Sequence, residues 1–252
     1  MIKLENVDVF GWEATIRGMR NPKNSWDKSD SCFKCNNMEC EDCANYEKRV
    51  LTNLGWKCDE VAVHIGENDL KLMKALAKAG SDHGKFLRMI NVTVDITAPL
   101  YWWKEFDTYK VGTVANSCST MHKIHERDLT LEDFSVDQCE ILAKNVYTQH
   151  IIPTFNLFRK LYCEVDKKLK TKDRYTEAER KHMIAQKKRF WYNLIQLLPS
   201  SYNQRRTVQL NYEVLRAMDR PGRRRDHKLD EWRTFCQWAE TLPYFKEICI
   251  DD

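Results

Sequence analysis

The alternation of apolar and polar positions predicts a strand near the middle of the chain. From Ile90 to Ile96 every second residue is isoleucine or valine, and the residues between them are polar. A period of two is typical of a strand with one buried face. Ala98 and Pro99 are expected to end this strand. A second short strand is predicted over residues 2–10.

The residues after this central strand predict a helix and then a loop. Aromatic side chains crowd the segment from Tyr101 to Tyr109, whereas Gly112 to Ser119 holds mostly small and hydroxyl-bearing residues. A strand and a helix that deliver such a loop commonly present a ligand site. The alternative is a core strand and helix followed by an ordinary turn, with the aromatic residues in the core.

Further segments carry apolar residues three or four positions apart and are predicted to be helices. They are residues 11–20, 67–79, a long segment from the capping-box pattern Ser135–Gln138 to about Val165, 176–198, a segment ending near Met218, and 228–241. In the second of these, Leu72, Leu76 and Ala79 share the predicted apolar face, with Leu70 and Met73 beside it, and Gly80 follows as the residue that ends the helix. Pro153 is expected to kink or split the long helix.

Helices dominate this pattern and strands are few, so the expected fold class is α+β, helix-rich with a small central sheet. Residues 1–252 are expected to form a single domain. Residues 21–60 are polar and irregular, and we expect them to be a cysteine-rich lobe inserted into it. The segment that follows Pro199 is expected to be a loop.

Four of the ten cysteines lie within this lobe at metal-ligand spacing. Cys32, Cys35, Cys40 and Cys43 form two Cys-x2-Cys pairs, which supply enough thiolates for a tetrahedral zinc site. Structural zinc is the preferred interpretation, and the spacing fits neither ferredoxin pattern. The alternative is four reduced cysteines in a flexible loop.

The net charge of +4 is unevenly distributed along the chain. Between Arg205 and Lys228 there are eight basic and three acidic residues, which favours a phosphate-bearing partner. No apolar run approaches membrane-spanning length, and the first residues lack the regions of a signal peptide, so we expect a cytoplasmic protein. The sequence has no phosphate loop and no dinucleotide-binding glycine motif.

Several separated motifs together resemble the flavin-dependent thymidylate synthase family, over residues 86–245. The central strand ends Val94-Asp95-Ile96, and the hydroxyl loop ends Ser117-Cys118-Ser119. Leu198-Pro199, Thr207 to Asn211 and Arg223-x3-His227 then follow in the order and spacing of that family. Where the family has its R-H-R motif, this chain has Tyr109-Lys110-Val111 or Asp107-Thr108-Tyr109, depending on which serine is matched.

The resemblance implies a homotetramer that binds FAD where subunits meet. It implies dUMP or a related pyrimidine nucleotide as substrate, methylenetetrahydrofolate as carbon donor and NADPH as reductant. The expected function is therefore reductive one-carbon transfer (methylation) to a pyrimidine nucleotide, in which the cofactor carries the chemistry. The alternative is a catalytically inactive protein of the same fold that binds nucleotide or nucleic acid through residues 205–228.

The resemblance also implies roles for individual residues. Ser117 and Ser119 would bind the phosphate or a pyrimidine carbonyl, and Ser119 would take part in catalysis; turn capping is the alternative. Arg205 and Arg206 would bind the nucleotide phosphate, or form a solvated helix start.

The remaining predicted residues lie near the flavin or the pyrimidine. Arg223 would bind the pyrimidine and stabilise negative charge in catalysis. Asn211, His227 and Lys110 would bind the flavin, with Lys110 standing in for a missing arginine. Local capping by Asn211 and a solvated basic loop around Arg223 are the alternatives.

Overall fold

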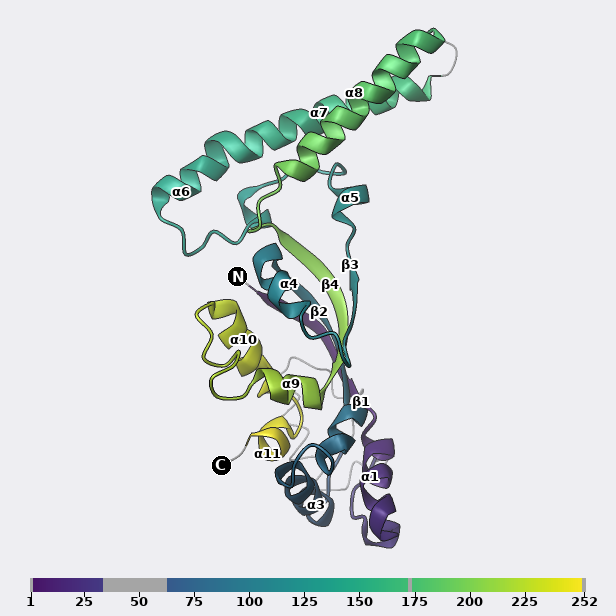
Figure 1. Ribbon diagram of the computed structural model, residues 1–252, viewed down its shortest axis with the longest axis vertical. Coiled ribbons are helices and arrows are strands. Elements are labelled where there is room, and N and C mark those ends of the chain that lie inside the picture. The colour runs from purple at the N-terminus through teal and green to yellow at the C-terminus, as the bar shows by residue number, and fades with distance from the viewer. Residues whose placement is uncertain (1, 34–62, 172–173, 251–252) are drawn as a thin grey trace, which may run out of the picture. The chain divides into compact units, whose positions relative to one another are not determined.

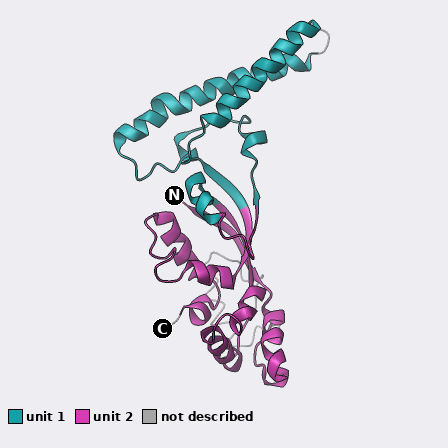
Figure 2. Cartoon of the chain, in the orientation of Figure 1, with its two compact units in different colours: residues 1, 97–106, 116–206 teal, residues 2–96, 107–115, 207–252 magenta. Residues whose placement is uncertain are grey.

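The computed structural model describes residues 2–33, 63–171 and 174–250 (Figure 1). Contacts divide the chain into two compact units (Figure 2). Unit 1 comprises residues 1, 97–106 and 116–206, and unit 2 comprises residues 2–96, 107–115 and 207–252. Of the predicted inserted lobe, residues 21–33 belong to unit 2 and 34–60 lie outside the described residues. The single-domain arrangement stays a prediction.

A four-stranded sheet has the order β1-β2-β4-β3. Its strands are β1 (Lys3–Phe10), β2 (Asn91–Pro99), β3 (Val114–Ser117) and β4 (Asn203–Asn211). Val92, Val94 and Ile96 on β2 are at most 1% exposed, which confirms the predicted alternation. The predicted end at Ala98 and Pro99 is confirmed, because β2 ends at Pro99 and α4 begins at the next residue.

Two strands lie where loops were predicted. The hydroxyl loop contains β3, an edge strand whose four residues are all exposed. Exposure on both faces explains why β3 lacks an alternating pattern. β4 (Asn203–Asn211) lies where a loop was predicted after Pro199. Its only two apolar residues, Val208 and Leu210, alternate with polar residues. An alternation of two apolar positions is too short to predict a strand.

Unit 1 contains a series of helices. They are α4 (Leu100–Phe106), α5 (Thr120–Lys123), η4 (Leu131–Asp133), α6 (Ile141–Val146), the π-helical η5 (Tyr147–Ile151), α7 (Ile152–Lys170) and α8 (Glu177–Gln196). Trp102, Trp103 and Phe106 of α4 are buried, which confirms the core interpretation of the aromatic segment. α7 and α8 pack side by side as a hairpin (Figure 1).

The predicted break at Pro153 is confirmed, because a π-helical turn separates α6 from α7 immediately before it. Proline has no N–H for the preceding turn, so the helix must rearrange there. The capping box predicted at Ser135 and Gln138 is wrong, since the helix begins only at Ile141. A capping box does open α8, where Thr176 pairs with Glu179.

Unit 2 contains a second series of helices. They are α1 (Trp12–Arg20), η1 (Asn21–Lys23), η2 (Trp26–Lys28), α3 (Glu67–Lys78), η3 (Gly84–Met89), α9 (Tyr212–Met218), α10 (Asp230–Ala239) and α11 (Phe245–Cys249). α11 was not predicted. Gly80 ends α3 with a φ of 106°, as predicted. The predicted apolar face of α3 is partly wrong: Met73, beside it, is buried and Leu72 and Leu76 are half-buried, but Ala79 is exposed and Ala77 is buried instead.

The buried face of α3 also carries a charged residue, Asp69, which forms a buried ion pair. The Arg20 Nε donates to Asp69 Oδ1 at 2.6 Å, and both side chains are at most 4% exposed. The other oxygen of Asp69 accepts from the hydroxyls of Ser29 and Ser31 at 2.7 and 2.6 Å. A polar residue on the buried face cannot be recognised from apolar periodicity. These bonds join residues 29–31 to α3.

Burial raises the pKa of Asp69, but hydrogen bonds from Ser31, Ser29 and Arg20 outweigh it and leave the pKa below its ordinary value. The carboxylate is therefore stabilised in its charged form. None of the helices in the described part of the chain is long and apolar enough to cross a membrane.

Candidate functional site

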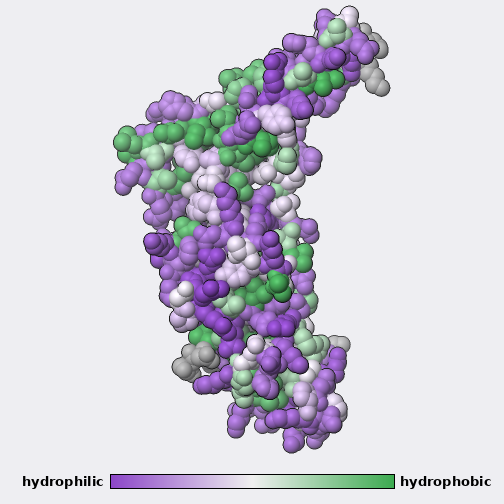
Figure 3. Space-filling model, viewed as in Figure 1, coloured by the Kyte–Doolittle hydropathy of each residue, from purple (hydrophilic) through white to green (hydrophobic). Residues whose placement is uncertain are grey.

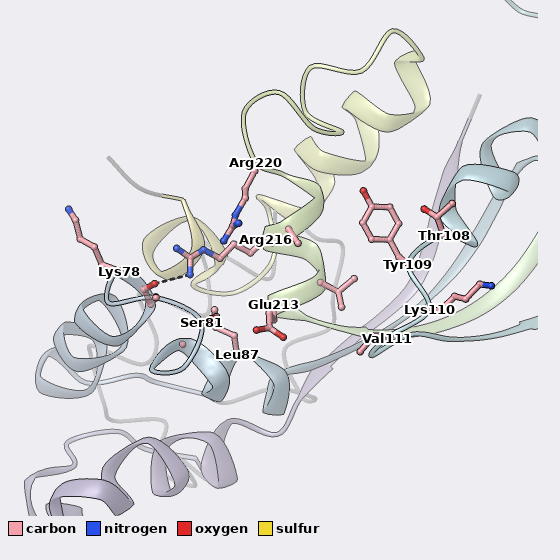
Figure 4. A pocket seen from close by; sticks show the side chains of 15 residues that line it. Lys78, Ser81, Leu87, Thr108, Tyr109, Lys110, Val111, Glu213, Arg216 and Arg220 are labelled. Atoms are coloured by element: carbon pink, nitrogen blue, oxygen red, sulfur yellow. Dashed lines mark hydrogen bonds between the residues drawn. The ribbon is translucent and has the colours of Figure 1, made fainter.

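A cavity of about 630 Å³ lies within unit 2 (Figure 4). Its walls come from the C-terminal end of α3, the turn and 3-10 helix that follow, residues 108–111, α9 and Arg220. Gly112 lets residues 108–111 approach α9 closely. It has a φ of 76°, and a Cβ there would lie 2.8 Å from the Asn211 Nδ2. The volume is in the range of small-molecule sites.

Positive charge dominates the cavity lining. Lys78, Lys110, Arg216 and Arg220 line it, and Glu213 is the only acidic residue in the described part of the lining. Glu213 accepts hydrogen bonds from Arg88 at 2.5 and 3.0 Å. The hydrogen bond to Glu213 raises the pKa of Arg88, so the Arg88 guanidinium stays charged. The lining therefore favours anions.

These four cations differ in what they contact. The Arg216 Nη1 donates to the Ala77 carbonyl oxygen at 2.9 Å and so caps the C-terminal end of α3. Lys78, Lys110 and Arg220 make no side-chain hydrogen bond or ion pair with any described residue. Their charges are available to a ligand.

Tyr109 joins this cavity to the basic turn after α9. Its hydroxyl accepts from the Arg224 Nε at 3.1 Å. The Arg224 guanidinium carbon lies 4.4 Å from the centre of the Trp232 ring. Such stacking is attractive because the face of an indole ring carries negative potential. Arg224 therefore fixes the Tyr109 side chain at the cavity wall.

Three of the predicted site residues in unit 2 have different surroundings. Lys110 lines the cavity. Asn211 is 7% exposed, and its Oδ1 accepts from the Val214 N–H at 3.1 Å, which caps α9. The His227 Nδ1 accepts from the Leu229 N–H at 3.1 Å, so Nε2 carries the proton of the neutral ring.

Arg223, the fourth predicted residue of unit 2, is exposed. Its neighbour Arg224 makes the aromatic contacts, and Arg225 forms two hydrogen bonds with Asp219 at 3.0 Å each. Arg223 therefore keeps its guanidinium toward solvent. The structure brings Lys110 and Asn211 together at the same part of unit 2, because both adjoin the segment that contains Gly112.

The predicted nucleotide residues of unit 1 lie on two paired segments. The Cys118 N–H donates to the Arg205 carbonyl oxygen at 2.9 Å, which places Ser117 and Ser119 beside β4. Ser117 is exposed on β3, and the Ser119 Oγ accepts from the His122 N–H at 3.3 Å as the cap of α5. The capping alternative for Ser119 is thus present in the structure.

Arg205 and Arg206 lie on this part of β4 rather than at a helix start. Arg205 is exposed. The Arg206 guanidinium carbon lies 4.1 Å from the centre of the Trp103 ring, and its Nε donates to Gln204 at 3.0 Å. These contacts hold Arg206 in one orientation. Whether the two arginines bind phosphate stays a prediction.

The cysteine motif lies largely outside the described residues. Cys35, Cys40 and Cys43 are not described, and Cys32 is an exposed free thiol. Among the described residues, no group of three or more possible metal ligands occurs together. The zinc site stays a prediction.

Lys78 and Tyr109 are cavity residues that the sequence did not indicate as binding residues. Lys78 is one of several lysines on an amphipathic helix, and nothing in its spacing separates it from the others. Tyr109 lies in the segment that replaces the R-H-R motif, which was the available signal.

Comparison of the sequence with protein-family models and with curated proteins gives no match. Comparison of the structure with solved structures gives similar chains over its full length. One is thymidylate synthase X from Helicobacter pylori with FAD and dUMP: TM-score 0.59, 11% identity, covering 100% of this chain and 98% of that one. Another, the flavin-dependent enzyme from Helicobacter pylori complexed with FAD and dUMP, has TM-score 0.59 and 13% identity, covering 98% and 99%.

Identities this low show a shared fold and nothing further. The expected helix-rich α+β fold of the thymidylate synthase X type is confirmed. The cysteine-rich insertion is not part of that confirmation.

Proposed function

We propose that this chain binds FAD and a pyrimidine nucleotide, dUMP or a relative of it, and transfers a one-carbon group to the pyrimidine reductively. Methylenetetrahydrofolate would donate the carbon and NADPH would reduce the flavin. The observation that carries the proposal is the fold, which matches proteins solved with FAD and dUMP along their whole length.

The residues of unit 2 fit a flavin dinucleotide. The cavity has the volume of a small-molecule site and an excess of cations, which suits phosphate groups. Lys110, Asn211 and His227 would hold the cofactor, and Tyr109 offers an aromatic ring at the wall. When bound, the flavin would supply the hydride for the reduction of the transferred carbon.

The residues of unit 1 suit a nucleotide. The Ser119 hydroxyl already accepts a hydrogen bond from its helix, so its own hydrogen is available for a phosphate or a carbonyl oxygen. Ser117 and Arg205 are exposed beside it, and Arg206 is held in place by Trp103. Separately, Arg223 of unit 2 is proposed to bind a pyrimidine and to stabilise negative charge on it.

A homotetramer is part of this proposal. Ile141, Leu142 and Val146 on α6 are 67%, 77% and 47% exposed, and Leu157 on α7 is 54% exposed. Figure 3 shows hydrophobic side chains gathered over α6 and the adjoining part of α7. A patch of this kind favours coverage by another subunit.

The visible spectrum of the purified protein tests the proposal. Bound FAD is expected to give a yellow protein, or to be taken up when FAD is added. Addition of dUMP and methylenetetrahydrofolate to the reduced protein should then reoxidise the flavin. A protein that takes up no flavin under either condition would not have the proposed function.

A binding protein without catalysis is the second candidate. Arg220, Arg223 and Lys228 make no side-chain hydrogen bond or ion pair with any described residue, which leaves their charges for a polyanion. This candidate predicts no flavin uptake and an affinity for polynucleotide that falls steeply as salt rises. Measuring both properties on one preparation separates the two functions.

A further inference from the structure

One end of the cavity in unit 2 gathers three cations, which we call the cationic end: Lys78, Arg216 and Arg220. They come from three places in the chain, namely the last turn of α3, the body of α9 and the residues after α9. Lys110 lies with Tyr109 and Val111 at the other end (Figure 4). Among the described residues the lining has a single carboxylate, Glu213, and Arg88 forms an ion pair with it.

The cationic end concentrates like charges. In Figure 4 the side chains of Arg216 and Arg220 point toward one another, whereas the Lys78 side chain extends away from them from the last turn of α3. Two neighbouring guanidinium groups repel each other, and both stay charged at any physiological pH. An anion between them would remove this repulsion and would gain charge-assisted hydrogen bonds.

The surrounding backbone leaves room for such an anion. Gly80 turns the chain with a φ of 106°, and a Cβ there would have no atom within 4 Å. Ser81 follows it in the cavity lining and adds a hydroxyl donor. Arg216 also offsets the partial negative charge at the end of α3, because it donates to the Ala77 carbonyl oxygen at 2.9 Å.

We propose that the cationic end binds a diphosphate group. Lys78 and Arg220 contact its oxygens, and Arg216 completes the site. The inference rests on the proposed function, in that the diphosphate is assigned to FAD. The two cations on α3 and after α9 then take the place of arginines that residues 107–111 do not supply.

Isothermal titration of the full-length protein tests this site, with inorganic pyrophosphate, ADP, FAD and riboflavin as separate probes. The test variant is Lys78→Ala/Arg220→Ala. Lys71→Ala/Lys74→Ala is the matched control, because it removes two exposed lysines of α3 that do not line the cavity. Lys78→Arg/Arg220→Lys keeps both charges.

For each of pyrophosphate, ADP and FAD, we expect the wild type and the control variant to have the same affinity. The test variant should bind each of them roughly tenfold to a hundredfold more weakly, because charged hydrogen bonds are lost. The charge-preserving variant should retain most of the affinity. Riboflavin, which has no phosphate, should bind all four proteins alike. Thermal melting of each variant checks that the fold is kept.

Equal affinity of the test variant and the wild type for pyrophosphate and FAD would overturn the site while leaving the proposed function in place. Pyrophosphate and ADP binding that the test variant loses, without FAD binding by any protein, would keep the diphosphate site and reject the flavin function. Absence of pyrophosphate binding by the wild type would overturn the site directly.

Discussion

Seven of the eight basic side chains of residues 205–228 divide into two groups according to what they contact. Arg206, Arg216, Arg224 and Arg225 serve internal contacts with aromatic rings, a helix end or carboxylates. Arg220, Arg223 and Lys228 have no side-chain partner among the described residues. The sequence predicts the excess of charge, but Trp103, Ala77 and Tyr109 lie about a hundred residues or more from the arginines they contact, so it does not predict the division.

Arg223 and Arg224 should respond differently to removal. Arg224→Ala loses the contacts with Tyr109 and Trp232 and should lower the free energy of unfolding by about 1–2 kcal/mol. Arg223→Ala should leave stability unchanged, since the side chain is exposed. The same change should weaken nucleotide binding, because Arg223 is proposed to bind the pyrimidine. Urea unfolding and dUMP titration of both variants measure this. Equal stability losses would contradict the assignment.

Asp69 should make the largest single contribution among the ion pairs of unit 2. Asp69→Asn leaves the buried Arg20 without its counter-charge, so the free energy of unfolding should fall by about 3 kcal/mol near neutral pH. Asp8→Asn, at an exposed position on β1, is the control and should change stability little. Urea unfolding of the two variants and the wild type gives the comparison.

The same residue predicts a pH dependence. The pKa of Asp69 lies below its ordinary value of 3.8 in the folded protein. Its contribution to stability is therefore fully present above pH 3.8 and is lost as the pH falls through the lower, folded pKa. Asp69→Asn should lack this part of the acid-induced loss. An identical acid profile for the variant and the wild type would contradict the prediction.

At the scale of elements, prediction succeeded where burial follows a regular period over several residues. β2 and α10 show this, because their buried positions, apart from Glu231 on α10, are apolar and regularly spaced. β4 pairs with β2 inside the sheet, yet arginine, threonine and glutamine occupy its exposed positions. Its place is set by pairing with distant strands, which a local pattern does not record. α11 was not predicted either, because it has five residues and packs against α3 and α9, which are distant in sequence.

The start of α3 depends on a carboxylate from outside the helix. Asp30 accepts from the N–H groups of Asn68 and Asp69 at 2.9 and 3.1 Å, and Gly66 at the N-cap has no side chain to do so. Asp30→Ala should therefore lower the free energy of unfolding by about 1 kcal/mol. Hydrogen exchange should quicken at residues 68 and 69 first. Unchanged protection there would show that the cap is dispensable.

At the scale of the whole molecule, the likeness in fold extends over the chain while the sequence motifs do not. The predicted site residues group as Ser117, Ser119, Arg205 and Arg206 in unit 1 and Lys110, Asn211, Arg223 and His227 in unit 2. The motifs supplied these positions. The cations that line the cavity depend on the packing of α3 against later segments, which sequence spacing alone does not reveal.

Self-association is a testable property at this scale. Ile141→Glu/Leu142→Glu places charges on the exposed apolar part of α6 and should lower the measured mass of the assembly in light scattering. Val114→Glu, also at an exposed apolar position, is the control on β3 and should leave the mass unchanged. A wild-type protein that is monomeric throughout would contradict the tetramer.

The backbone pairing of Cys32 with His64 suggests that residues 34–62 can be replaced by a short turn. Their N–H and carbonyl groups exchange hydrogen bonds of 2.8 and 2.9 Å, and the Ser31 Oγ accepts from the Gly66 N–H at 3.1 Å. The two ends of the intervening segment are thus already joined. Replacing residues 34–62 by an Asn-Gly turn would complete a two-residue hairpin. Such a replacement would remove Cys35, Cys40 and Cys43 and would keep Cys32 in its backbone pairing with His64.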